Sequence, residues 1–322
     1  MLVIGYMTFA LKIIADSYQK FNITNTSVSA CKNPPHIRCF QKHYLTKEQN
    51  SKCANASLTL GTIGHDIVEK AIVENLTIAE CIQDKKIQDK INSYISFDKK
   101  DQMKFEFGIK NLEAIGNNHL ENLKELPKQK WKTEAEHIKW IDPINVPFRM
   151  FIDLTGETHV NDIKNKFPSV KYYPLKKVKK DIAKEFPNKK LDTTKDNPNR
   201  IGDWVCSHPK IDQRAFTTDL MQIALYSHTT GLKPSLSYAS ATDRILFTED
   251  NCDELKPENL KLWLQELIAY EIAWEKKLIA ANGSLEELMW LCVPDFSDIR
   301  KKSFWYQGVP EEYIKGYLNF YV

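Results

Sequence analysis

Two acids and a base stand close together in the stretch FIDLTGETHVNDIKNK, residues 151–166. Asp153 and Asp162 are nine positions apart, on either side of Gly156, and Lys164 follows two positions after the second acid. Two carboxylates that lie close together repel each other, and a divalent cation would offset that repulsion. Carboxylate oxygens are ligands that Mg²⁺ and Mn²⁺ prefer. The spacing therefore predicts a metal site, provided that the chain brings both acids together.

The residues around the acids predict a β-hairpin that would do so. Apolar residues recur at every second position from 148 to 154, and the same period continues through Asp162 and Lys164 on a second strand. A turn centred on 157–158 would place Asp153 directly opposite Asp162, and a turn one residue earlier would make them diagonal neighbours. The alternative is a solvated hairpin whose acids and lysine face water.

Three further polar residues lie on segments that are predicted to be helical. Apolar residues recur with helical spacing in 58–78, which carries His65, and imidazole is a common ligand of divalent metals. The segment 214–231 is a second amphipathic helix, ended by a glycine, and its Gln222 and Tyr226 are four positions apart, so both side chains face one way. Each feature alone is more typical of a structural or solvated side chain.

The charge of the chain is informative locally rather than globally. The 322 residues are 42% hydrophobic and 27% charged, a composition typical of a globular protein, and the net charge of +3 gives no sign of a nucleic-acid partner. Between Lys164 and Arg200, however, 11 Lys and one Arg stand against four acids, a local charge of +8. We interpret 167–200 as a basic insertion that leaves the core, either to contact phosphates or as a solvated loop.

The cysteines and the first residues favour a cytoplasmic protein. Seven cysteines are scattered and odd in number, without a CxxC pair, which argues against a disulfide scaffold and for a reducing compartment. The opening MLVIGYMTFALKIIADSYQK has no basic start and is interrupted by Lys12 and Asp16. We expect it to form a buried helix or strand-helix, not a signal peptide or a membrane span.

The order of segments predicts an α/β or α+β fold with a mixed central β-sheet flanked by helices. Strand patterns fall in 133–165 and again on either side of residue 240, and helical patterns precede, separate and follow them. We expect one domain, 1–322, with a mainly helical part (1–130), a sheet core (133–245), the basic insertion, and a C-terminal helix with an aromatic tail (256–322).

The polar motifs follow one another in a particular order: G-x-x-x-H on the first helix, I-D at a strand end, D-I-K on the next strand, and Q-x-x-x-Y on the next helix. This set resembles the PD-(D/E)xK nuclease superfamily, in particular its RecB-like and phage-exonuclease branch. The segments 27–45 (SVSACKNPPHIRCFQKHYL) and 222–240 (QIALYSHTTGLKPSLSYAS) look like the corresponding flanks of that branch. The resemblance covers most of 27–245, with Ile152 in place of the proline of the family name.

The resemblance implies a restriction-endonuclease-like core and a Mg²⁺- or Mn²⁺-dependent DNA nuclease, in particular an exonuclease of recombination, repair or replication. It implies that Asp153, Asp162, the backbone carbonyl of Ile163 and His65 hold the metal. Lys164 would stabilise the developing charge on the phosphate or orient the attacking water. The residues implied to contact the nucleic acid are Gln222, Tyr226, Arg38 and Lys42, the first two alternatively bracing Lys164.

Several alternatives stay open within this resemblance. The protein could be an endonuclease, could act on RNA, or could be a silent nucleic-acid-binding module. The expected partners are DNA and a recombination or replication protein, with the host cytoplasm as location if a phage encodes the chain. Some members of the branch carry an iron–sulfur cluster, but here the C-terminal part offers only Cys252 and Cys292, so we expect none. We expect Cys31 and Cys39 to be buried apolar residues.

Overall fold

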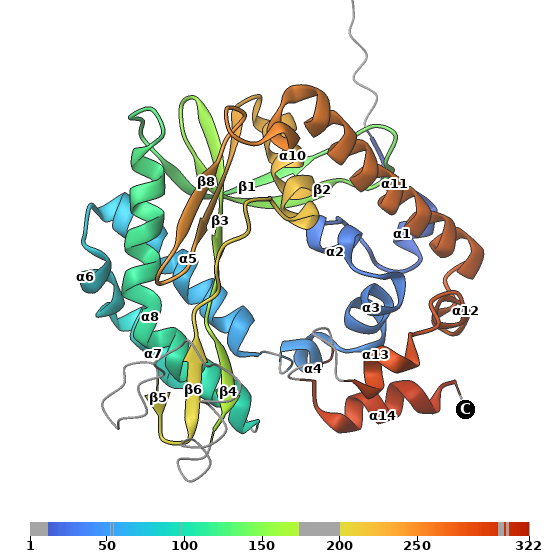
Figure 1. The fold of residues 1–322 in the computed structure, drawn as a ribbon. Coiled ribbons are helices and arrows are strands. Elements are labelled where there is room, and N and C mark those ends of the chain that lie inside the picture. The colour runs from blue at the N-terminus through green and yellow to red at the C-terminus, as the bar shows by residue number, and fades with distance from the viewer. Residues whose placement is uncertain are drawn as a thin grey trace, which may run out of the picture.

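The fold is built around a five-stranded mixed sheet (Figure 1). The computed structural model describes residues 12–321 apart from 52, 54, 97, 174–199, 302–305 and 307–308. In spatial order the strands are β1 (Lys132–Lys139), β2 (Phe148–Thr155), β3 (His159–Asn165), β7 (Lys233–Ala239) and β8 (Arg244–Phe247). β1, β2 and β3 form an antiparallel meander, β7 lies parallel to β3, and β8 is antiparallel to β7. The predicted mixed sheet flanked by helices is confirmed.

Helices cover the sheet from two sides (Figure 1). On one side α5 (Ala56–Glu74) contacts β3, and α8 (Lys99–Lys124) contacts β7 and β8. On the other side α10 (Thr217–Thr230) packs on β3 and β7, and α11 (Pro257–Ala281) packs on α10. The shorter helices are α1 (Asp16–Gln19), α2 (Val28–Lys32), α3 (Pro35–Cys39), the π-helical η1 (Phe40–Tyr44), α4 (Lys47–Ser51), α6 (Ile78–Ile82), α7 (Lys85–Ser93), η2 (Asp253–Leu255), α12 (Leu285–Trp290), α13 (Phe296–Arg300) and α14 (Glu311–Asn319).

The sheet separates two hydrophobic cores. Val160 and Leu236 point into the larger core, which α10, α11 and the N- and C-terminal helices complete. Ile163 and Leu246 point into the smaller core, formed with α5 and α8. Because the apolar side chains of β3 serve both cores, this strand lies in the middle of the molecule, and its polar residues are held from both sides. Cys31 and Cys39 lie in the larger core, buried as predicted.

The register of the hairpin is the one predicted for a turn at residues 157–158. Leu154 pairs with Asn161, and Thr155 pairs with Val160. The ladder ends there, and the strands separate at the position where Asp153 would face Asp162. On β2 the apolar positions are buried and the alternating ones are exposed or half-buried, as the period of two predicted.

The basic insertion differs in part from its prediction. Its two ends form a second antiparallel sheet of β4 (Ser169–Tyr172), β6 (Trp204–Ser207) and β5 (Arg200–Ile201). Val170 and Cys206 of this sheet pack against Met103 and Phe107 of α8. The strands are only two to four residues long, so the composition of the surrounding Lys- and Pro-rich stretch obscured them. Residues 174–199, with eight of the 11 lysines and all four acids counted in the predicted charge, lie outside the described residues.

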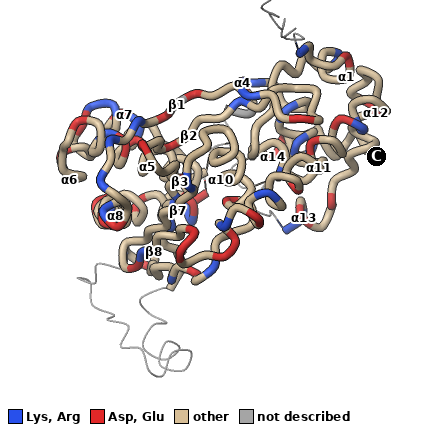
Figure 2. The backbone as a smooth tube through the Cα atoms, turned by 90° about the horizontal axis from the view of Figure 1, so that it is seen from above, with Lys and Arg blue, Asp and Glu red and all other residues tan. Residues whose placement is uncertain are grey.

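The predicted helices are present with small shifts at their ends. The helix expected over 58–78 ends at Glu74, because Asn75 adopts a left-handed conformation with φ of 53°. α10 ends at Gly231, whose φ of 72° suits glycine. Of the predicted N-terminal helix, residues 1–11 lie outside the described residues and α1 is a single turn. None of the helices in the described part is long and apolar enough to cross a bilayer. Lys and Arg positions are dispersed over many elements (Figure 2).

Candidate metal centre and catalytic cleft

His65, Glu69 and Asp153 meet where α5 crosses the end of the hairpin. His65 and Glu69 are four positions apart on α5, so both project from the same side of the helix. His65 Nδ1 lies 3.5 Å from Asp153 Oδ2, and that oxygen also accepts a 2.8 Å hydrogen bond from the backbone N–H of Ile163. One ligand atom from each of the three side chains lies within 4.8 Å of the others.

Negative charge is crowded in this triad, and the pKa values of its side chains are shifted as a result. Glu69 is 7% exposed, and burial together with the nearby Asp153 and Glu134 raises the pKa of its carboxyl to about 8. Burial would also raise the pKa of Asp153, but His65, Lys164 and the backbone N–H of Ile163 together outweigh burial and hold that pKa below its usual range. Asp153 in turn raises the pKa of His65 against the effect of burial. Glu69 is therefore the acid of the triad whose negative charge is least offset by its neighbours.

These donors fit Mg²⁺ or Mn²⁺. Two carboxylates and an imidazole are hard or borderline ligands of the kind that such ions accept. Opposite ligands of Mg²⁺ lie about 4.2 Å apart and adjacent ligands about 3 Å apart, so an ion would draw the three groups closer together than they lie here. The cation would also compensate the negative charge that raises the pKa of Glu69.

Asp162 lies beside the triad and belongs to a second polar cluster, together with Lys164 and Gln222. Its Oδ2 is 2.7 Å from Lys164 Nζ, in a geometry that makes an ion pair but no hydrogen bond within the described residues. Its Oδ1 accepts a 3.2 Å hydrogen bond from the amide of Gln222. Burial raises the pKa of Asp162 to about 7, helped by Asp153 and Asp219 and opposed by Lys164. Asp162 is thus a buried carboxylate that Lys164 and Gln222 hold beside the triad.

Gln222 and Tyr226 hold this cluster from α10. The Gln222 amide donates 2.7 Å to the Tyr226 hydroxyl, which donates 2.8 Å to the carbonyl of Phe151 on β2. Lys164 Nζ lies 3.4 Å from Gln222 Oε1 and 3.8 Å from Asp219. The pair thus ties helix, hairpin and lysine together. Of the two roles implied by the resemblance, these contacts match the bracing of Lys164.

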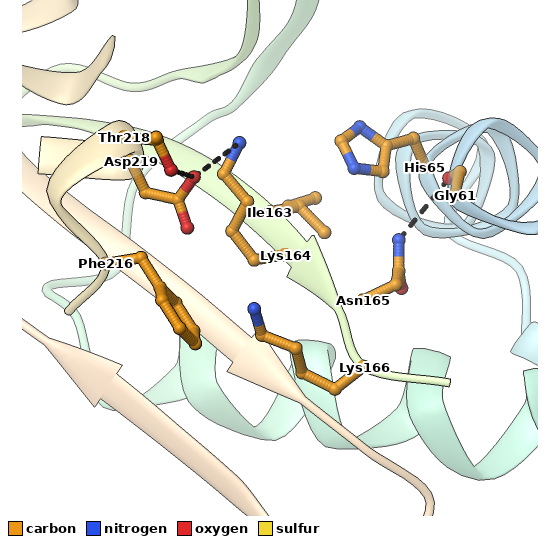
Figure 3. Close-up of a pocket in the computed structure, with 9 residues that line it drawn as sticks. All are labelled: Gly61, His65, Ile163, Lys164, Asn165, Lys166, Phe216, Thr218 and Asp219. Carbon is orange, nitrogen blue, oxygen red and sulfur yellow. Dashed lines mark hydrogen bonds and ion pairs between the residues drawn. The ribbon is translucent and has the colours of Figure 1, made fainter. Parts of the chain in front are cut away.

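His65 of the triad and Lys164 of the second cluster both line one open cleft of about 720 Å³, whose lining does not include Glu69, Asp153 or Asp162 (Figure 3). His65 stands on one side of it, and Lys164 points across it towards Asp219. The lining residues are Gly61, His65, Ile163, Lys164, Asn165, Lys166, Phe216, Thr218 and Asp219. The cleft exposes Lys164 and His65 to a molecule that enters it.

Arg38 is a correction to the predicted phosphate contacts. Its guanidinium is buried and donates to both carboxylate oxygens of Glu271 on α11, at 2.7 and 3.0 Å. An arginine whose charge is neutralised inside the protein does not serve as a surface contact for phosphate. The sequence showed a basic helix but not the acid 233 positions away that pairs with it. Lys42 is exposed on η1, outside the residues that line the cleft.

Two site residues were missed by the sequence analysis. Glu69 could have been found, because it stands four positions after His65, the same spacing that drew attention to Gln222 and Tyr226. Asp219 had no such signal. It reaches the cleft because its Oδ2 accepts a 2.7 Å hydrogen bond from the buried hydroxyl of Tyr238, a contact between α10 and β7.

We expect the melting temperature of the metal-free protein to fall as the pH rises from about 7 to about 8, above the range in which His43 and His119, whose pKa values burial lowers, make stability rise with pH. The folded-state pKa values of Glu69 (about 8) and Asp162 (about 7) lie above the ordinary values of 4.5 and 3.8. In this window the folded protein keeps protons that the unfolded chain has released, so a rise in pH favours unfolding. Thermal denaturation in EDTA across a pH series measures the effect, and Glu69→Gln should flatten it.

The protons on Glu69 and Asp162 also make the effect of Mg²⁺ on the stability of the fold depend on pH. Mg²⁺ binds the deprotonated carboxylates, so it should raise the melting temperature more at pH 8, where metal-free repulsion is greatest, than at pH 5. Equal pH slopes for the native protein and Glu69→Gln would show that this acid does not carry the crowded charge.

Comparisons with protein-family models, with curated proteins and with solved structures gave no significant match. What the site can do is therefore argued from its own geometry. That geometry brings six predicted residues to one region of the hairpin, α5 and α10: His65, Asp153, Asp162, Lys164, Gln222 and Tyr226.

Proposed function

We propose that the protein is a Mg²⁺- or Mn²⁺-dependent nuclease that hydrolyses phosphodiester bonds in DNA. The observation that carries the proposal is that a His–Glu–Asp ligand set lies beside a second buried aspartate paired with a lysine, and that His65 and Lys164 of these groups line one cleft. Crowded carboxylates suit a cation, and a lysine beside them suits a substrate that is itself anionic. The role in recombination, repair or replication follows from the family resemblance.

The fold supports the same proposal. The motifs stand on α5, β2, β3 and α10, the helix, two strands and helix on which the resemblance to PD-(D/E)xK nucleases expects them. We propose that the sheet β1-β2-β3-β7-β8 is a restriction-endonuclease-like core. The pairing of β2 with β3 ends just before Asp153 and Asp162, so the two acids stand where these strands diverge.

The residues divide the chemistry between them. His65, Glu69, Asp153 and Asp162 would hold the cation, which when bound polarises a phosphate and lowers the pKa of a water. Asp153 is fixed for this task by the backbone N–H of Ile163. Gln222 orients the other oxygen of Asp162 and keeps Lys164 on the cleft side.

Lys164 acts as a cation rather than as a base. Burial lowers the pKa of its ammonium group, but Asp162, Asp219 and Asp153 together raise that pKa above its ordinary value. The group therefore stays protonated at neutral pH and cannot accept a proton from water. Its charge can stabilise the negative charge that develops on the phosphate in the transition state.

The test is incubation with end-labelled linear DNA, closed circular DNA and RNA of the same sequence, with Mg²⁺ and with Mg²⁺ plus EDTA. We expect linear DNA to be degraded from an end, circular DNA to persist, and EDTA to stop the reaction. Cleavage of the circle would identify an endonuclease, and preference for RNA would change the substrate. Binding of DNA without any cleavage would leave a nucleic-acid-binding module and overturn the proposal.

Lys164→Met should lower turnover on linear DNA by about a hundredfold, the effect of removing one group that stabilises developing charge. Metal affinity, measured by titration with Mn²⁺, should change little, because lysine is not a ligand. Lys171→Met, an exposed lysine on β4, is the matched control and should cleave normally. Weak metal binding with full turnover at saturating metal would contradict the role assigned to Lys164.

A further inference from the structure

Phe216 presents an aromatic ring to the cleft at the start of α10 (Figure 3). The side chain is 43% exposed, which is unusual for a large apolar residue in a cleft of charged groups. Its backbone is nevertheless fixed, because the Phe216 N–H donates 3.1 Å to the hydroxyl of Tyr238, which itself donates to Asp219. The ring is therefore held in position while part of it faces the cleft.

Lys166 lies against this ring. Its Nζ is 4.1 Å from the ring centroid of Phe216 and 4.6 Å from that of Tyr238. No carboxylate of the described residues lies within 4 Å of that ammonium group. Burial lowers the pKa of Lys166, with Asp219 opposing burial. The cleft thus contains a lysine that has aromatic neighbours but no ion-pair partner.

Lys166 follows Lys164 just beyond the end of β3, and Phe216 at the start of α10 lies next to it in the same cleft. Lys164 and Lys166 are two positions apart, so they share a face of the β3 chain at a separation of about 6.6 Å. Figure 3 shows Lys164 directed to Asp219 and Lys166 directed to Phe216. A polyanion whose reacting phosphate lies at His65 and Lys164 would place its neighbouring unit at Lys166 and Phe216.

A cation beside a partly exposed ring suits one nucleotide unit, with its phosphate on the ammonium group and its base on the ring. In a duplex the faces of each base are covered by the neighbouring base pairs, so a protein ring can stack only on an unpaired base. We propose that Phe216 and Lys166 form a subsite for an unpaired nucleotide next to the scissile phosphate, and that the protein engages single-stranded DNA or a frayed end. This inference rests on the proposed nuclease function.

The test is binding of fluorescein-labelled dT12 and of a blunt 12-base-pair duplex, by anisotropy, in an Asp153→Asn background with EDTA to prevent cleavage. Phe216→Leu keeps an apolar contact with Tyr238 but removes the stacking face. It should weaken dT12 binding by roughly 5- to 100-fold, the range for loss of one base–aromatic stack. Duplex binding should change less than twofold. Phe216→Trp should retain dT12 affinity.

Lys166→Met should make the salt dependence of dT12 binding shallower by about one unit of log K against log salt, since one phosphate contact is lost. Two matched controls lie far along the chain: Phe296→Leu, a 40% exposed ring on α13, and Lys276→Met on α11. Both should bind dT12 and duplex like the parent.

The outcomes of these experiments distinguish the subsite proposal from the nuclease proposal. Selective loss of dT12 binding in Phe216→Leu, in a protein that never cleaves DNA with Mg²⁺, would support the subsite and overturn the nuclease proposal. Cleavage of linear DNA by a protein whose dT12 affinity does not depend on Phe216 would overturn the subsite alone. Equal weakening for dT12 and duplex would also overturn it, because stacking on an unpaired base predicts a difference between them.

Discussion

Asp162→Asn and Asp153→Asn are each expected to lower Mg²⁺-dependent cleavage of linear DNA by more than about a hundredfold. The physical reason is that each change removes a negative charge from the place where cation and phosphate meet, where charge interactions are strongest. In Asp162→Asn, Lys164 also loses the partner that lies 2.7 Å from its Nζ. The measurement is the initial rate of end-label release at saturating Mg²⁺, and a rate within tenfold of the native protein would overturn the metal-site assignment.

The two variants should differ in stability, which separates them from variants that simply unfold. In EDTA at pH 8, Asp162→Asn should change the melting temperature little, because it removes a costly buried carboxylate with a pKa of about 7 but also leaves Lys164 without its nearest partner. Asp153→Asn should lower it, because the pKa of Asp153 is depressed and its ionised form stabilises the fold. Asp250→Asn, an exposed aspartate near β8, is the control and should change neither property.

Glu271→Ala is expected to destabilise the protein by about 3–5 kcal/mol, the cost of leaving a buried charge unpaired. Glu271 is fully buried and accepts hydrogen bonds from both terminal nitrogens of Arg38, and also from Tyr18 and Thr26. These donors come from the N-terminal segments, so the carboxylate ties those segments to α11. Urea denaturation at pH 7 should show a lower midpoint with an unchanged slope.

A double variant tests whether the loss is caused by the unpaired charge. Arg38→Met combined with Glu271→Leu removes both charges and keeps most of the volume, so it should recover most of the stability that Glu271→Ala loses. Glu266→Ala, on the same helix and bonded to the exposed Tyr270, should stay within about 0.5 kcal/mol of the native protein. If Glu271→Ala lowers the free energy of unfolding by less than about 1 kcal/mol, the Arg38–Glu271 ion pair does not stabilise the fold.

The parts of this protein that could be predicted from its sequence are those set by neighbouring residues. The alternation of apolar side chains specified β2 and limited the hairpin to two registers, of which the one with the turn at residues 157–158 is found. Spacing of four positions on a helix put Gln222 and Tyr226 on one side of α10, where they are hydrogen-bonded to each other. Such features depend on backbone geometry over a few residues, and every copy of the pattern has the same consequence.

Tertiary structure alone decided which distant side chains meet. Arg38 had the appearance of a surface contact for phosphate, but it pairs with Glu271 because α3 and α11 pack in the same core. Asp219 enters the cleft through its hydrogen bond to Tyr238, which depends on the parallel pairing of β3 with β7. The partners in these pairs are 233 and 19 positions apart, and no local pattern connects them. They are selected by the burial of whole elements, a property of the assembled chain that no short stretch of sequence contains.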